Sequence, residues 1–282
     1  GFPMQFKSFF DLDHRLEDID RMGDPLAALD EVVQWEKFRP LLSRIHDKKR
    51  KSNAGRRPFD VVLMLKILIL QSLYNLSDNR TEFMIRDRLS FARFLKLDLS
   101  DRVPDENTIW DFRESLKRHD LLDALFAKFD AMLCEKGFVA KKGQILDASI
   151  TSSPAQRNTH KENKKIKAGE GKSLWPENPA KKRQKDTDAR WTKKNGKSHF
   201  GYKNHIGVDN KHKLIRTFAV TPASTHDSQL LGELVDPNNS SGNVWADAAY
   251  QSEAAIEELV AAGYRPHIQR KDKRDHPLLM VA

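Results

Sequence analysis

Residues 143–150 read Gly-Gln-Ile-Leu-Asp-Ala-Ser-Ile, a short apolar stretch with one carboxylate, Asp147, near its middle. An apolar run of this length that follows a glycine predicts a β-strand. Residues 243–247, Asn-Val-Trp-Ala-Asp, form a second such stretch with its own carboxylate, Asp247. A carboxylate inside an apolar strand is costly to bury unless it is paired or binds a cation. The two stretches therefore point to both a fold and a functional site.

The sequence pattern changes at Gly137. Before it, apolar residues recur at helical spacing behind helix-starting residues such as Asp105, so residues 1–136 are expected to form an all-helical domain. After it, the pattern predicts a strand, a long basic insert, two strands with hairpin spacing, a helix, a strand, a helix and a last strand. This order predicts an α+β chain in which residues 137–282 form a ribonuclease-H-like mixed β-sheet flanked by helices.

The first and fourth strands of such a sheet are neighbours, so Asp147 and Asp247 are expected to lie side by side. Adjacent carboxylates repel each other unless a divalent cation neutralises them. Mg²⁺ prefers oxygen ligands, and it commonly takes one or two carboxylates together with waters and phosphate oxygens. Two such ions about 3.5–4 Å apart stabilise the attacking and leaving oxygens of a phosphodiester displacement. The alternative is that each aspartate caps a helix or a turn.

The chain is basic, with 49 Lys and Arg against 40 Asp and Glu and a formal charge of +9. One region carries this excess, because residues 151–200 contain 14 basic and 5 acidic residues and the remainder balances. The low-complexity sequence of residues 151–197, punctuated by Trp175 and Trp191, predicts a flexible basic insert. Such an insert is suited to neutralising DNA phosphates, and a solvated loop is the alternative.

Basic residues in two regions are candidates for contact with DNA: the insert with the strand behind it, and a cluster that precedes the helix near Pro58. A solvated linker is the alternative for the second cluster. The candidates are Lys48, Lys49, Arg50, Lys51, Arg56, Arg57, Lys181, Lys182, Arg183, Lys185, Lys193, Lys194 and Lys203.

Other features of the sequence narrow the class of protein. The lone cysteine, Cys134, cannot form an internal disulfide, which favours a reducing compartment. The histidines do not have the spacing of a zinc site. No apolar run reaches the roughly 18 residues of a membrane span, so no membrane association and a cytoplasmic location are expected.

Seven short motifs in this order resemble those of the DDE transposases of bacterial insertion sequences. The resemblance is to the insertion-sequence-five group, with an InsH-type N-terminal domain and a catalytic domain like that of the insertion-sequence-four group. The matching segments are Gly55-Arg56-Arg57-Pro58, Tyr74-Asn75-Leu76-Ser77-Asp78, Val103-Pro104-Asp105 with Thr108-Ile109 and Phe112-Arg113, Ile145-Leu146-Asp147-Ala148, residues 199–209, Ala223 with His226-Asp227, and Ala246-Asp247-Ala248 with Tyr250-Gln251.

The resemblance implies that residues 1–136 bind DNA and that the second domain cuts and joins phosphodiester bonds at transposon ends. Asp147 and Asp247 would be the first two acids of the catalytic triad, with Mg²⁺ or Mn²⁺ as the metal. The implied partner is double-stranded DNA, both the terminal inverted repeats and the target. The resemblance also implies that the protein forms a homodimer on the DNA. It implies a bacterial cytoplasmic protein that is associated with the nucleoid when it is bound to DNA.

The sequence departs from the family pattern after Asp247. The third acid of the family is a glutamate on a later helix, and the 35 residues after Asp247 contain no matching motif. The domain is therefore expected to be incomplete at its C-terminal end, and this chain is expected to have little or no transposase activity. Two alternatives stay open: a non-catalytic, truncated transposase that occupies terminal repeats, and a metal-dependent nuclease unrelated to transposition.

Overall fold

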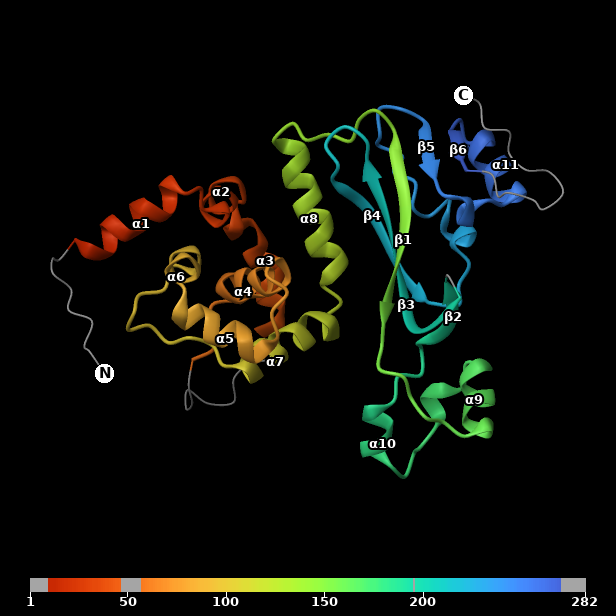
Figure 1. The fold of residues 1–282 in the computed structure, drawn as a ribbon, viewed down its shortest axis with the longest axis horizontal. Coiled ribbons are helices and arrows are strands. Elements are labelled where there is room, and N and C mark those ends of the chain that lie inside the picture. The colour runs from red at the N-terminus through yellow and green to blue at the C-terminus, as the bar shows by residue number, and fades with distance from the viewer. Residues whose placement is uncertain (1–9, 47–56, 195, 270–282) are drawn as a thin grey trace. The chain divides into compact units, whose positions relative to one another are not determined.

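The computed structural model of the chain describes residues 10–46, 57–194 and 196–269 (Figure 1). The chain divides into two compact units, Gly1–Met132 and Leu133–Ala282. The first unit is helical and the second contains a mixed β-sheet with helices, so the predicted α+β class is confirmed. The cluster Lys48, Lys49, Arg50, Lys51 and Arg56 lies outside the described residues.

Helices of the first unit begin at residues that the sequence marks as caps. Asp24 accepts from the backbone N–H of Leu26, and Asp105 accepts from that of Thr108, as the sequence predicts for Asp105. The helices are α1 (Asp11–Arg21), α2 (Pro25–Val32), α3 (Arg39–Leu42), α4 (Val61–Leu73), α5 (Asp78–Asp87), α6 (Leu89–Leu95), α7 (Glu106–Arg118) and α8 (Leu122–Glu135), which ends in the second unit, with 3-10 turns η1 (Trp35–Phe38) and η2 (Ser43–His46).

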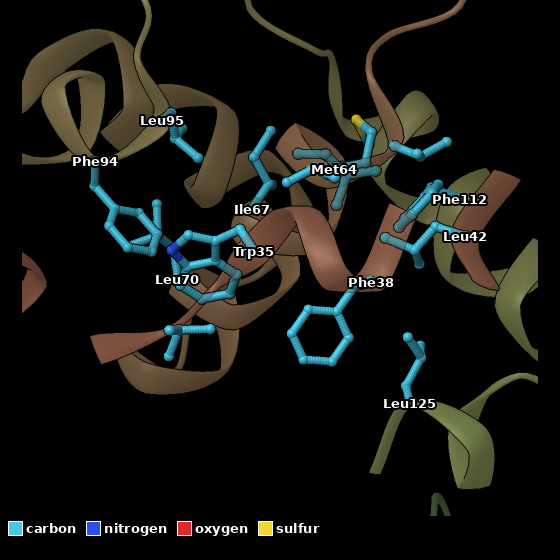
Figure 2. Packing of buried hydrophobic residues seen from close by; sticks show 14 of the residues in the cluster. Trp35, Phe38, Leu42, Met64, Ile67, Leu70, Phe94, Leu95, Phe112 and Leu125 are labelled. Atoms are coloured by element: carbon cyan, nitrogen blue, oxygen red, sulfur yellow. The ribbon is translucent and has the colours of Figure 1, made fainter. Parts of the chain in front are cut away.

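A cluster of aliphatic and aromatic side chains forms the core of the first unit, and α4 supplies much of it (Figure 2). Trp35 meets Phe94 edge to face, with ring centroids 5.6 Å apart. Offset and edge contacts of this kind add to the free energy of burying the rings. The labelled members of the cluster are Trp35, Phe38, Leu42, Met64, Ile67, Leu70, Phe94, Leu95, Phe112 and Leu125.

One charged side chain, Lys66, lies inside this apolar helix and is 4% exposed. Its ammonium Nζ is 2.5 Å from Asp30 Oδ1 and 2.7 Å from the carbonyl oxygen of Phe94. The same nitrogen lies 5.1 Å from the ring centroid of Trp35 and 4.5 Å from that of Phe94. A buried cation is tolerated only with such partners, and here they tie α2, α4 and α6 together.

The second unit is built on a six-stranded sheet with the topology of ribonuclease H. Strand β3 pairs antiparallel with β1 and β4, while β5 pairs parallel with both β1 and β6. Strand β2 adds to the other end of β3. The strands are β1 (Gln144–Ser152), β2 (Arg190–Lys194), β3 (Lys197–Asp209), β4 (Ile215–Pro222), β5 (Asn243–Ala246) and β6 (Arg265–Ile268).

The two faces of this sheet differ in burial, because successive side chains of a strand point to opposite sides. Leu146, Ala219, Val244 and Ala246 lie on one face and pack into the core of the unit. Three further elements and one loop complete the core. Leu230 comes from η4 (Asp227–Leu230), and the segment after it supplies Leu231, Leu234 and Val235. Tyr250 comes from η5 (Ala248–Tyr250) and Leu259 from α11 (Glu253–Ala261).

Residues 151–197 differ from the flexible insert that the sequence predicts. Between β1 and β2 the structure has α9 (His160–Lys167), η3 (Gly171–Ser173) and α10 (Pro179–Gln184), as Figure 1 shows. Its apolar residues Ile166, Leu174 and Ala189 are buried. Composition does not predict these helices because the few apolar residues are scattered among many lysines.

Glu162 is the polar centre of this insert. Its side chain completes a capping box with Thr159 at the start of α9. Its Oε1 also accepts hydrogen bonds from Trp175 Nε1 and Lys181 Nζ, each at 2.7 Å. The pKa of Glu162 is lowered to about 2 by the Lys181 ammonium, the Thr159 backbone N–H and the Trp175 indole.

Within the described residues, no single helix is long and apolar enough to cross a bilayer. Helices α4 and α5 pass that test only as a pair, and they are bent by 103° at the break between them.

Replacing Lys66 by alanine is expected to lower the free energy of unfolding by about 3 kcal/mol, because it opens a cavity and removes the partner of Asp30. Lys66→Met fills the space and should cost about half as much. Urea denaturation followed by circular dichroism measures both. The control is Lys117→Ala, whose side chain is 55% exposed and whose loss should cost about 0.5 kcal/mol or less. Equal urea midpoints for Lys66→Ala and Lys117→Ala would contradict the conclusion that Lys66 stabilises the first unit.

The lowered pKa of Glu162 predicts an acid-sensitive contact between α9 and α10. A depressed carboxyl pKa stabilises the fold above the unfolded value of about 4.3 and loses that effect as pH falls toward the folded value of about 2. The indole N–H resonance of Trp175 should therefore shift with a midpoint near pH 2. Glu162→Gln should abolish this titration, while the exposed Glu177→Gln should leave it unchanged. A midpoint above pH 4 would refute the assignment.

Candidate active site

Asp147 and Asp247 occupy equivalent positions on neighbouring parallel strands. The last paired residues of β1 and β5 are Leu146 and Ala246, and each aspartate comes directly after its paired residue. In-register residues of a parallel pair point to the same face, and neighbouring strands are about 4.8 Å apart. Continued by one residue, this register points both side chains to the same face of the sheet.

Gly143 allows β1 to start this close to β5. A Cβ there would lie 2.6 Å from the carbonyl oxygen of Asn243 and 2.6 Å from the ring of Trp245, and its φ is +83°. The Asn239 amide holds the same residue through two hydrogen bonds to its backbone, of 3.0 and 2.8 Å. This end of the pairing is thus fixed by backbone contacts that exclude a side chain.

Both carboxylates are exposed, although each follows an apolar stretch of sequence. They lie on the open face of the sheet, opposite the core face that contains Leu146 and Ala246. Asp147 Oδ1 accepts from the backbone N–H of Ala148 at 2.7 Å, and Asp247 Oδ1 accepts from that of Ala249 at 3.0 Å. Asp247 therefore does cap η5, the alternative considered from the sequence, but this contact uses a single oxygen.

A buried polar group lies under the acidic pair. His205 on β3 and Tyr250 at the end of η5 have no exposed surface, and His205 Nδ1 is 3.4 Å from the Tyr250 hydroxyl. His205 Nε2 is 2.9 Å from the hydroxyl of Thr221 on β4. Burial lowers the pKa of His205, so the imidazole is neutral at neutral pH.

Tyr250 experiences the field of the acidic pair. Burial raises the pKa of its phenol, and the carboxylates of Asp227, Asp147 and Asp247 raise it further. The phenol therefore stays protonated and can donate a hydrogen bond. Sequence reasoning did not single out His205 or Tyr250 as site residues, although both fall inside the matched motifs.

Lys203 was a predicted DNA-binding residue, and it is engaged inside the unit. Its Nζ donates to Asp227 Oδ1 and to the carbonyl oxygen of Thr225, both at 2.7 Å. Both side chains of the ion pair are 14% exposed. These contacts favour a structural role for Lys203 over contact with a phosphate.

The other predicted basic residues fall into two groups among the residues that the structure describes. Lys181 Nζ is paired with Glu162, and Lys185 Nζ donates to the carbonyl oxygen of Arg157 at 2.7 Å. The second group has exposed side chains, and its members are Arg57, Lys182, Arg183, Lys193 and Lys194.

The metal-binding capacity of the site rests on two carboxylates. Over residues 10–46, 57–194 and 196–269, no group of three or more His, Cys, Asp or Glu side chains could hold a metal ion. Two exposed carboxylates on one face offer oxygen ligands that fit Mg²⁺ or Mn²⁺, with the remaining positions left for water and phosphate oxygens.

A model of a transposase domain, DUF772, matches residues 14–115, and a model of a transposase DDE domain matches residues 142–277. The first match falls in the helical unit and the second in the unit with the acidic pair.

A distant structural similarity comes from a solved structure described as a cryo-EM structure of the piggyBac transposase synaptic complex with hairpin DNA. It covers 86% of this chain at 14% sequence identity with a TM-score of 0.39, and this chain spans 49% of that chain. By these two matches, the chain combines a transposase domain of the DUF772 type with a transposase DDE domain.

Proposed function

We propose that this protein takes part in DNA transposition, cutting and joining phosphodiester bonds at the ends of an insertion sequence of the insertion-sequence-five group. The observation that carries the proposal is the parallel register of β1 and β5, whose last paired residues, Leu146 and Ala246, directly precede Asp147 and Asp247. Their carboxylates would hold Mg²⁺ or Mn²⁺ against the DNA backbone.

The metal ions and the protein side chains would have different roles in the reaction. Bound divalent ions would supply the positive charge that stabilises the attacking and leaving oxygens of the displacement. Asp147 and Asp247 provide the oxygen ligands, and their backbone hydrogen bonds orient the carboxylates. Tyr250 and His205 lie below as neutral groups, so neither of them competes with a metal ion for the carboxylates.

DNA is the proposed partner because exposed basic side chains are frequent in the insert. The exposed group Lys182, Arg183, Lys193 and Lys194 would contact backbone phosphates. Both the terminal inverted repeats and the target are proposed substrates. Two transposon ends have to be held together, so we propose a homodimer on DNA, in the bacterial cytoplasm and at the nucleoid.

A second candidate function is that of a non-catalytic protein that occupies terminal repeats. It is favoured by the two-carboxylate site, since the described residues bring no third acidic ligand to it. Under this proposal the 282-residue polypeptide binds DNA equally well in EDTA and shows little cleavage or strand transfer in Mn²⁺. Clear strand transfer that Asp147→Ala abolishes would exclude it.

Asp147→Asn and Asp247→Asn are each expected to weaken Mn²⁺ binding about tenfold or more, because each removes one of two charged oxygen ligands. Electron paramagnetic resonance of free Mn²⁺ during a titration measures the affinity. Asp188→Asn, an exposed aspartate of the same unit, serves as the control and should bind like the wild type. Mn²⁺ binding that survives both variants would place the metal elsewhere.

Lys182→Ala combined with Arg183→Ala is expected to reduce the salt dependence of DNA binding. Each phosphate contact contributes about 0.9 to the slope of log K against log salt, so the slope should fall by about 1.8. Fluorescence anisotropy over a salt series gives the slope. Lys136→Ala with Lys211→Ala removes two exposed lysines outside the insert and should keep the slope of the wild type. An unchanged salt slope in the Lys182→Ala, Arg183→Ala variant would show that these two residues do not contact DNA.

A further inference from the structure

The two tryptophans of the insert have different surroundings. Trp175 is half buried, with its indole N–H on Glu162 and the Lys181 ammonium 5.0 Å from its ring centroid. Trp191, on β2, is 55% exposed. Its ring packs on one side against Phe200 of β3, with centroids 5.3 Å apart. Trp175 therefore serves the fold of the insert, whereas Trp191 presents an aromatic surface to solvent.

The β2–β3 hairpin that carries Trp191 is firmly anchored at its base. The Arg190 guanidinium donates to three backbone carbonyls, those of Thr187, Ala189 and Ile166, at 2.6, 3.0 and 3.0 Å. The Tyr202 hydroxyl lies 2.7 and 2.8 Å from the two carboxylate oxygens of Asp186. A ring on such a hairpin can receive a ligand without first being ordered, which lowers the entropic cost of binding.

The hairpin is strongly cationic. Residues 190–199 contain four Lys and Arg and no Asp or Glu. Lys194 and Lys197 are register partners on β2 and β3, and like charges placed directly opposite each other destabilise a strand pair. Lys193 follows Trp191 by two residues and so points to the same side of β2. A polyanion laid on the hairpin would relieve this repulsion, so the charge pattern favours a nucleic acid as the ligand.

The register places Trp191 on the same face of the sheet as the acidic pair. Trp191 pairs with Phe200, and Phe200 shares its side of β3 with Ile206, the partner of Asp147. Phe200 and Ile206 are six positions apart, which corresponds to about 20 Å along the strand. Ser149 and Thr151 of β1 are exposed on this face and lie between the two positions. Exposed polar side chains of β1 therefore lie between Asp147 and the aromatic surface on this face.

We propose that Trp191 stacks on an unpaired base of the DNA strand whose phosphate lies at Asp147 and Asp247, while Lys193, Lys194 and Lys197 contact phosphates of that strand. The proposal rests on the proposed function for the choice of DNA as ligand. An unpaired base is required because both faces of a base inside a duplex are already stacked. Base–aromatic stacking of this kind tolerates any sequence.

The test measures binding of the 282-residue chain in EDTA to two DNAs by fluorescence anisotropy. One is a blunt duplex, and the other is the same duplex with a single-stranded tail of about five thymidines. Trp191→Ala is expected to weaken binding to the tailed DNA about tenfold, which corresponds to about 1.4 kcal/mol, and to leave blunt-duplex binding unchanged. Trp191→Phe should retain most of the preference for the tail.

A matched control is available in the first unit. Trp110 on α7 is 53% exposed, close to the value for Trp191, so Trp110→Ala removes a similar amount of exposed aromatic surface. It should leave the ratio of the affinities for tailed and blunt DNA at the wild-type value. In addition, Lys194→Gln should lower the salt slope for the tailed DNA by about 0.7, the contribution of one single-strand phosphate.

Equal binding of Trp191→Ala and the wild type to the tailed DNA would overturn the stacking proposal and leave the proposed function intact. Equal losses on blunt and tailed DNA would also overturn it, because the tryptophan would then contact duplex or support the fold. A wild-type chain that binds neither DNA would overturn both proposals.

Discussion

Parallel pairing between β1 and β5 is the constraint on which the candidate site depends. The pairing is short, from Gln144 and Val244 to Leu146 and Ala246. Because side chains alternate along a strand, a slip of one residue would send one carboxylate to the opposite face and separate the pair. Burial of Leu146 and Val244 on the core face opposes such a slip, since it would expose apolar surface. The register of the acidic pair is thus stabilised by the hydrophobic core on the other side of the sheet.

Much of this arrangement could be predicted from the sequence. The order of strands and helices after Gly137 predicts the mixed sheet, and that topology makes Asp147 and Asp247 neighbours although nothing in their local sequence connects them. The helical first unit follows from apolar spacing and from caps such as Asp105. These predictions succeed because each depends on local pattern combined with the few ways in which strands can be ordered.

Other features depend on contacts between distant residues, and local patterns do not encode these. The exposure of both carboxylates follows from which sheet face is covered, and the hydrogen bond between His205 and Tyr250 joins β3 to η5. In the insert, the lysine-rich composition does not predict helices α9 and α10, which are stabilised by Glu162 and a few buried apolar side chains. Lys66 is a similar case, because its interruption of an apolar helix is explained only by Asp30 and Phe94, which come from two other helices.

The points where the insert leaves and rejoins the sheet have a consequence for the evolution of the protein. β1 ends at Ser152, and its register partner on β3 is Gly201, so the segment between them begins and ends at adjacent positions. A Cβ at Gly201 would collide with the carbonyl oxygen of Thr151, which shows how closely the two strands approach there. A change in the length or sequence of this segment therefore need not move Asp147, just as a hairpin loop can be exchanged without moving its strands. Under the proposed function, the contacts of the insert with DNA can thus change while the metal ligands stay in place.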